Sequence, residues 1–286
     1  MITETFGESV IGASHVRAGT ICQDSHKIVQ RGNATVFAVA DGHGSAAAEF
    51  SNDGSGLAVD VFCTLMEGFI ERYQLDTHMT TSPALVTYLN REGQTKVART
   101  ITEEWRALVL KTHMDLHREI ITNDNGDVDD AAILKKYGTT LLGMLVANDF
   151  FFAFQLGDGD IMRVDENGIE PIIQADKLLG VETHSMSKID GGTRSAGKAY
   201  AWESSFTKFM RINRQEGLPY AYFLTTDGFA NSYASEEDFH KALLAYYAVL
   251  NQHGIRVLSE NLAKWLSETS ADGCGDDVTM VVCYNS

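Results

Sequence analysis

Two kinds of hydrophobic periodicity divide this chain of 286 residues. A helical spacing of apolar residues, with Leu57, Val61, Leu65 and Phe69 four residues apart, predicts a long helix from about Ala46 to Tyr73. Short apolar runs that end in turn residues predict strands instead. These runs lie at 36–40, 139–146, 150–156, 161–164, 169–173, 220–226 and 278–284.

Further helices are expected before and after this group of strands. One begins after Ser82-Pro83, because proline suits a first helical position, and continues to Leu116 with a break near 91–93. Two more are expected at 236–250 and 255–268. Residues 174–215 have no clear period, and we interpret them as an irregular excursion. Because strands and helices are grouped rather than alternating, the pattern predicts an α+β fold with antiparallel sheets, in one domain over residues 1–286.

Composition excludes several classes of partner. The chain has 23 basic and 39 acidic residues, a formal net charge of −16. This balance argues against binding to nucleic acid and against docking on an anionic membrane. The N-terminus lacks the features of a signal peptide, and the four cysteines form no CxxC pair. We therefore expect reduced thiols, a cytoplasmic location and a monomer.

Aspartate stands beside glycine at the ends of several predicted strands. The four places are Asp41-Gly42, Gly157-Asp158-Gly159, Asp227-Gly228 and Gly275-Asp276, the last just before a strand. A single Asp-Gly pair is usually only a turn signal. Four such carboxylates at one edge of a fold would repel one another unless a cation lay between them. Oxygen ligands of this kind suit Mg²⁺ or Mn²⁺.

The order and spacing of these pieces resemble the type 2C (PPM) metal-dependent protein serine/threonine phosphatases, and their bacterial branch in particular. The resemblance covers nearly the whole chain. It rests on an ordered set of motifs: Gln23-Asp24, Ala40-Asp41-Gly42-His43-Gly44, Gly138-Thr139-Thr140, Gly157-Asp158, Thr226-Asp227-Gly228 and Asp276-Asp277-Val278-Thr279. It implies two antiparallel sheets packed face to face, with helices on both outer faces.

The resemblance also implies a metal-binding role for matching positions. It implies two bound Mn²⁺ or Mg²⁺ ions, with a third, looser ion in bacterial members. Asp41 matches the aspartate that bridges two ions, and Gly42 the residue whose carbonyl binds the second. Asp227 and Asp276 match the remaining carboxylates of the first ion, and Asp158 the aspartate linked to the third.

The implied reaction is hydrolysis of phosphoserine or phosphothreonine by a metal-activated water. Asp24 matches an acidic residue that holds metal-bound water, and His43 matches the proposed general acid. An alkoxide is a poor leaving group and needs a proton, which a histidine can supply. The expected partners are a phosphorylated protein substrate and a cognate serine/threonine kinase. The excursion at 174–215 would form a flap beside the site.

Two positions depart from the family pattern. Gln23 stands where the family commonly has a metal-binding glutamate, and Gly19 stands where it has an arginine that grips the substrate phosphate. Arg17, two residues away, and His15 are the candidates for the role of that arginine. These departures keep two alternatives open: a catalytically weak or inactive member that binds a phosphoprotein or kinase, and a phosphoesterase for small molecules.

Neighbouring acidic residues have a plainer interpretation. Asp160 and Asp277 adjoin candidate ligands, and we interpret them as supporting or solvated groups. The acidic stretch 124–130 fails the spacing of a calcium-binding loop and is expected to be a solvated loop.

Overall fold

The computed structural model describes residues 3–78, 80–174, 184–188, 200–212 and 218–286. Within these ranges the strands form two five-stranded sheets in which every neighbouring pair is antiparallel. In spatial order the first sheet has β1 (Thr3–Val10), β10 (Val278–Asn285), β9 (Tyr220–Thr225), β6 (Asp160–Asp165) and β7 (Gly168–Pro171). The second has β2 (Ser25–Arg31), β3 (Ala34–Ala40), β4 (Leu141–Val146), β5 (Phe150–Leu156) and β8 (Phe206–Arg211).

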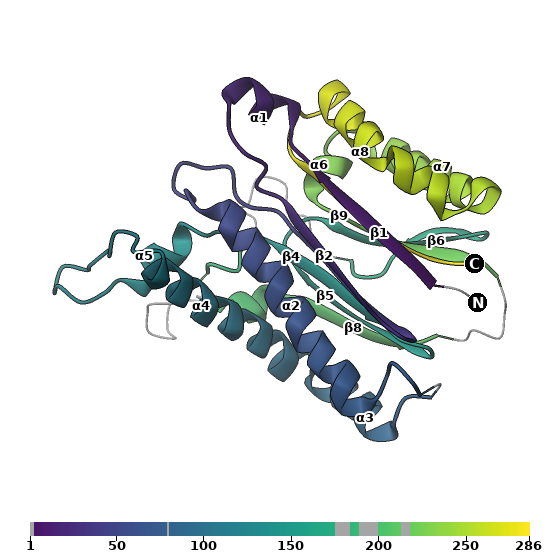
Figure 1. The fold of residues 1–286 in the computed structure, drawn as a ribbon, viewed down its shortest axis with the longest axis horizontal. Helices are drawn as coiled ribbons and strands as arrows, with labels where there is room; N and C mark the ends of the chain where they lie inside the picture. The colour runs from purple at the N-terminus through teal and green to yellow at the C-terminus, as the bar shows by residue number, and fades with distance from the viewer. Residues whose placement is uncertain (1–2, 79, 175–183, 189–199, 213–217) are drawn as a thin grey trace.

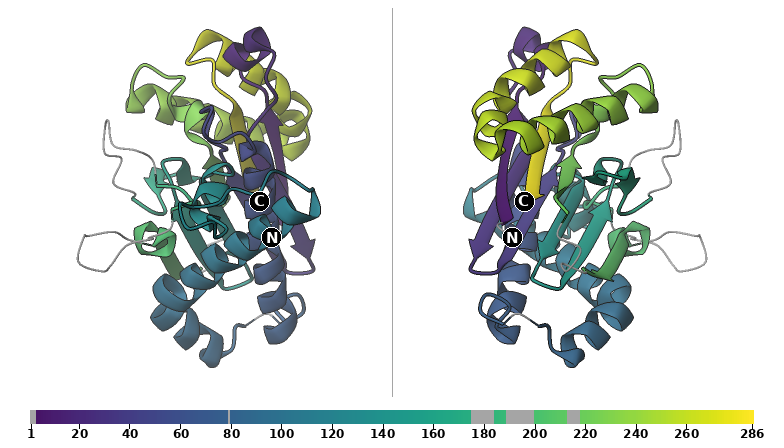
Figure 2. Two further views of the ribbon diagram at one scale, coloured as in Figure 1. Left: turned by 90° about the vertical axis from the view of Figure 1, so that its left-hand side faces the viewer. Right: turned by 90° about the vertical axis from the view of Figure 1, so that its right-hand side faces the viewer.

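The two sheets lie face to face between two layers of helices (Figures 1 and 2). α7 (Glu236–His253) and α8 (Ile255–Asp272) cover the first sheet, and α2 (Ser51–Tyr73) and α4 (Ala98–Asp115) cover the second. The shorter helices are α1 (Ala13–Ala18), α3 (Pro83–Glu92), α5 (Asp130–Lys135) and α6 (Asp227–Ala230), with a π turn at Gly93–Val97 and a 3₁₀ turn at Ala201–Ser204. None of the helices in the described part of the chain is both long and apolar enough to cross a membrane.

Strand β3 shows why the central strands are mostly apolar. Its side chains alternate between two hydrophobic layers, as the period of a strand requires. Phe37 and Val39 pack between the two sheets, whereas Val36 and Ala38 pack toward α2. Both faces are buried along this stretch, so a polar side chain without a hydrogen-bond partner at any of these four positions would be costly.

The predicted fold class is confirmed: the molecule is an α+β sandwich of two antiparallel sheets with helices on both outer faces. The predicted boundaries differ in detail. The helix expected from Ala46 begins at Ser51, and the break expected near 91–93 is a π turn that joins α3 to α4. Hydrophobic spacing locates an apolar face better than the residue at which a helix starts.

The expectation of an irregular excursion at 174–215 is wrong for residues 206–211. These residues form β8, which pairs with β5 at the edge of the second sheet. An edge strand has one open side and mixes polar with apolar residues, so it carries a weak sequence signal. Residues 175–183, 189–199 and 213–215 of the expected excursion lie outside the described residues.

Candidate metal centre

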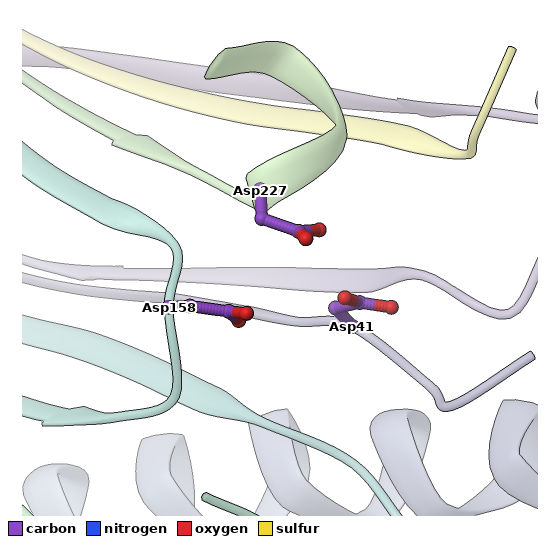
Figure 3. Close-up of side chains that lie close together, drawn as sticks. All are labelled: Asp41, Asp158 and Asp227. Carbon is purple, nitrogen blue, oxygen red and sulfur yellow. The ribbon is translucent and has the colours of Figure 1, made fainter. Parts of the chain in front are cut away.

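Three carboxylates from separate parts of the chain meet at one end of the sandwich. Asp41 follows β3, Asp158 lies between β5 and β6, and Asp227 begins α6 after β9. One oxygen from each lies within 4.8 Å of the others. Figure 3 shows Asp227 reaching down from α6 toward the side chains of Asp41 and Asp158. Because β3 and β5 belong to the second sheet and β9 to the first, the cluster spans both sheets.

The backbone of Asp41 is held by two threonines of the motif Gly138-Thr139-Thr140. The N–H of Asp41 donates to Thr140 Oγ1 over 2.9 Å. Its carbonyl accepts from the N–H of Thr140 and from the hydroxyl of Thr139, each at 2.8 Å. These bonds fix the direction in which the Asp41 carboxylate leaves the strand end.

Neighbouring amide side chains hold the turn that carries Asp158 and the carboxylate of Asp227. Gln155 Nε2 donates to the carbonyls of Gly159 at 2.8 Å and Gly157 at 3.4 Å, which fixes the turn that carries Asp158. Gly157 has φ +119°, a conformation that favours glycine. Asn231 Nδ2 donates to Asp227 Oδ2 over 2.9 Å, one turn further along the chain.

Burial and crowding disfavour negative charge at this end of the sandwich. Burial, with help from the carboxylates of Asp277 and Asp227, raises the pKa of Asp24 to about 8, although the hydroxyl of Thr226 donates to Asp24 Oδ2 at 2.7 Å. Burial and the carboxylates of Asp24 and Asp227 raise the pKa of Asp41 well above its usual value. A group of oxygen donors that repel one another fits a hard divalent cation.

Asp276 and Asp277 have different environments although they are adjacent. The side chain of Asp276 is 51% exposed, and its Oδ1 lies 3.7 Å from His15 Nε2. Asp277 is buried, and its Oδ1 lies 2.9 Å from His15 Nδ1. Asp276 contributes to the raised pKa of Asp41, so it lies near the cluster. The solvated alternative for Asp277 is wrong, because this carboxylate accepts backbone hydrogen bonds from Gly12 and Gln23.

Gln23 and Gly42 lie against each other next to the cluster. The carbonyl of Gln23 accepts from the N–H of Gly42 at 3.2 Å and from the hydroxyl of Ser55 at 2.6 Å. A β-carbon at Gly42 would lie 2.6 Å from that carbonyl oxygen, so only glycine fits. The side-chain Oε1 of Gln23 points toward Gly44, 3.4 Å from the place of a β-carbon there.

The remaining predicted residues lie around this centre. The backbone N–H of His43 donates to the carbonyl of Gly138 over 3.0 Å. The His43 ring packs on the same glycine, with its Nδ1 2.9 Å from where a β-carbon of residue 138 would lie. Arg17 is an exposed residue of α1, and its guanidinium lies near Gly275. The structure therefore places His15, rather than Arg17, in contact with an aspartate of the predicted ligand set.

Sequence reasoning missed the residues that orient the carboxylates. Asn231 follows Asp227 by four residues, the spacing at which side chains meet on a helix, and this was the available signal. Gln155 is a single polar residue in the apolar strand β5, which was a second signal. Both act on neighbours close in sequence, so a search beyond the aspartates themselves would have found them.

The sequence of the chain matches a known protein family. A family model described as protein phosphatase 2C matches residues 11–267. No curated protein sequence matches the chain.

Solved structures share the fold at low identity. The catalytic domain of the serine/threonine protein phosphatase PstP in complex with two manganese ions is 17% identical, with a TM-score of 0.57 over 99% of each chain. The S. agalactiae serine/threonine phosphatase is 14% identical, with a TM-score of 0.58 over 100% of each chain. RsbX in complex with magnesium is 14% identical, with a TM-score of 0.52 over 99% of this chain and 96% of RsbX.

Proposed function

Because the chain belongs to the protein phosphatase 2C family, we propose that it hydrolyses phosphoserine and phosphothreonine in proteins with bound Mn²⁺ or Mg²⁺. The observation that carries the proposal is the convergence of Asp41, Asp158 and Asp227, whose oxygens lie within 4.8 Å of one another. The related structures of PstP with manganese and RsbX with magnesium support the choice of metals.

In this proposal Asp41, Asp227 and Asp276 hold the catalytic cations, together with the carbonyl of Gly42, and Asp158 binds a further ion. Such cations neutralise charge on phosphoryl oxygens and make water a stronger nucleophile at neutral pH. Gln23 would add a neutral oxygen from the Gly42 side.

The chain's own side chains supply the proton transfers and the positioning. Asp24, held by the hydroxyl of Thr226, would orient a water molecule for attack on phosphorus. His43 would protonate the leaving serine or threonine oxygen. His15, beside Asp276, would contact the substrate phosphate, and Arg17 is the second residue proposed for that role.

The expected substrate is a phosphoprotein and the opposing enzyme a serine/threonine kinase, in a bacterial signalling pathway. The proposed place of action is the cytoplasm, where cysteines such as Cys22, Cys63, Cys274 and Cys283 stay reduced; none of them forms a disulfide in the described part of the chain. We propose that the chain acts as a single domain over residues 1–286 and as a monomer, with part of 174–215 as a flap beside the site.

The deciding experiment measures hydrolysis of a phosphothreonine peptide and of a small aryl phosphate with Mn²⁺, with Mg²⁺ and with EDTA. We expect both substrates to be hydrolysed with metal, and the activity to vanish with EDTA and return on adding metal. Full activity after exhaustive chelation would contradict the metal mechanism. Hydrolysis of the aryl phosphate alone would identify a small-molecule phosphoesterase, and peptide binding without turnover would identify a regulatory module.

A further inference from the structure

A cavity of about 520 Å³ opens beside the acidic centre, between β6 and the start of α7. Its wall is made partly of residues that adjoin the centre in sequence or contact it. Gly159 and Asp160, which follow Asp158 directly, line it, as does Asn231, whose amide holds Asp227. The volume lies within the roughly 300–1,000 Å³ of ordinary ligand pockets. A group bound here would therefore lie next to a phosphate at the centre.

The wall of this cavity combines apolar surface with negative charge. Met162, Ile173 and Phe239 provide apolar surface, and Asp160 and Glu236 provide carboxylates. His240 also lines the cavity, with its Nε2 3.8 Å from Glu236 Oε1. Neither lysine nor arginine occurs among the described residues that line it. The lining therefore suits a ligand with an apolar stem and a positively charged end.

Gln155 adds a buried acceptor to this wall. The residue is 1% exposed, and its Nε2 is committed to the carbonyls of Gly157 and Gly159. These two bonds fix the orientation of the amide, so the other atom is the oxygen. That Oε1 is buried and has no hydrogen-bond partner among the described residues. A buried acceptor left unpaired is costly, and a ligand that donates a hydrogen bond removes the cost.

We propose that this cavity receives a lysine or arginine side chain of the substrate, near the phosphorylated residue in sequence. This inference rests on the proposed function, because it assigns the substrate that the same centre would act on. Lysine and arginine side chains carry donors and no acceptors, and they cover apolar surface with their methylene stems. Their charge also matches the −16 net charge of the chain.

An anionic group is the competing occupant, because α7 begins at the cavity and helix N-termini attract anions. That end of α7 already has a capping side chain and negative charge of its own. Ser235 Oγ accepts from the N–H of Asp238, and Glu236, Glu237 and Asp238 supply negative charge to the first turn. An anion would also face Asp160 across the cavity, so the observations favour a cation.

The test uses phosphothreonine peptides that differ at one flanking position, where they carry lysine, norleucine or glutamate. Binding of the phosphonate analogues, which cannot be hydrolysed, is measured by fluorescence anisotropy on the full chain loaded with Mn²⁺. The variants are Glu236→Gln, which neutralises a carboxylate of the wall, and Glu237→Gln, which makes the same change at an exposed neighbour outside it.

At the best flanking position we expect the lysine peptide to bind about fivefold tighter than the norleucine peptide. Glu236→Gln should reduce this ratio to about twofold, and Glu237→Gln should leave it unchanged. Equal binding of lysine and norleucine peptides, tighter binding of the glutamate peptide, or an unchanged ratio in Glu236→Gln would overturn the inference. Aryl phosphate hydrolysis by the unaltered chain is measured in parallel, and its absence would contradict the proposed function while the binding ratio still tests the cavity.

Discussion

The backbone N–H of Gln23 donates a 2.7 Å hydrogen bond to Asp277 Oδ2, which joins the segment before β2 to the start of β10. The other oxygen of Asp277 accepts from the N–H of Gly12 at 2.6 Å. Asp277 is only 3% exposed, and its bond from Gly12 is buried and its bond from Gln23 partly buried. One buried carboxylate thus holds two N-terminal segments against the C-terminal strand, directly beside the candidate metal centre.

Replacing Asp277 should therefore cost stability. In Asp277→Asn, one of the two backbone N–H groups faces an amide NH₂ instead of an oxygen, and a charged acceptor is lost. We expect the free energy of unfolding to fall by about 2–4 kcal/mol, as measured by urea denaturation. Asp272→Asn, at an exposed position at the end of α8, is the matched control and should change it by less than about 0.5 kcal/mol. An equal effect in both variants would show that the bonds of Asp277 contribute little.

Asp41 and Asp227 should be needed for turnover but not for folding. Asp41→Asn and Asp227→Asn each keep the side-chain shape and remove a proposed metal ligand, so we expect kcat to fall by about a thousandfold. Burial and neighbouring carboxylates raise the pKa of Asp41, so its charge opposes folding at neutral pH. Asp41→Asn should consequently raise the free energy of unfolding in EDTA. Near-normal turnover in either variant would contradict the proposed site.

The stability of the metal-free protein should fall as the pH rises. Burial raises the pKa of Asp24 to about 8, whereas an aspartate in the unfolded chain titrates near pH 4. Between these values the folded state binds more protons than the unfolded state, so the free energy of unfolding decreases with pH. Urea denaturation in EDTA at several pH values from about 4 to 8 measures this slope. We expect the free energy of unfolding of Asp24→Asn to depend less steeply on pH. A free energy of unfolding that increases with pH in the unaltered chain would contradict this prediction.

The interior strands of this fold could be predicted from the sequence, whereas the edge strands β1, β2 and β8 could not. β5 runs Phe150–Leu156 with every residue buried, because both of its faces lie in hydrophobic layers. A run this short, rich in aromatic residues and bounded by turns favours a strand over a buried helix. β1, β2 and β8 are edge strands with partly exposed side chains, so their alternation of polar and apolar residues is weak.

The same distinction holds for the candidate site. The aspartates at strand ends were predictable, because the end of a buried strand is a local feature of the sequence. The bond between Gln23 and Asp277 was not, because it joins residues 254 positions apart and depends on how the two sheets pack. Local pattern therefore located the acidic residues, and only the tertiary structure identified which of them holds the backbone.

Gln23→Glu should strengthen metal binding. If Gln23 contributes its oxygen to a cation, a carboxylate of nearly the same size adds a negative charge there without changing the geometry. The metal concentration for half-maximal activity should fall several-fold, with little change in turnover at saturating metal. Calorimetry and rates over the same metal titration measure both quantities. Gln30→Glu, at an exposed position of β2, adds the same charge elsewhere, and identical curves for the two variants would exclude Gln23 from the metal shell.

Two substrates with different leaving groups distinguish an acid role of His43 from a structural role. The backbone N–H of His43 donates to the carbonyl of Gly138, and the imidazole ring of His43 packs on that glycine. A threonine alkoxide needs a proton in order to leave, whereas an aryl oxide such as p-nitrophenolate leaves readily without one. In His43→Gln we therefore expect kcat to fall about a hundredfold or more for a phosphothreonine peptide, but less than about tenfold for p-nitrophenyl phosphate. Equal losses for the two substrates would mean that His43 shapes the loop rather than donating a proton. His26→Gln, in β2, is the control for loss of a partly buried histidine and should affect both substrates equally.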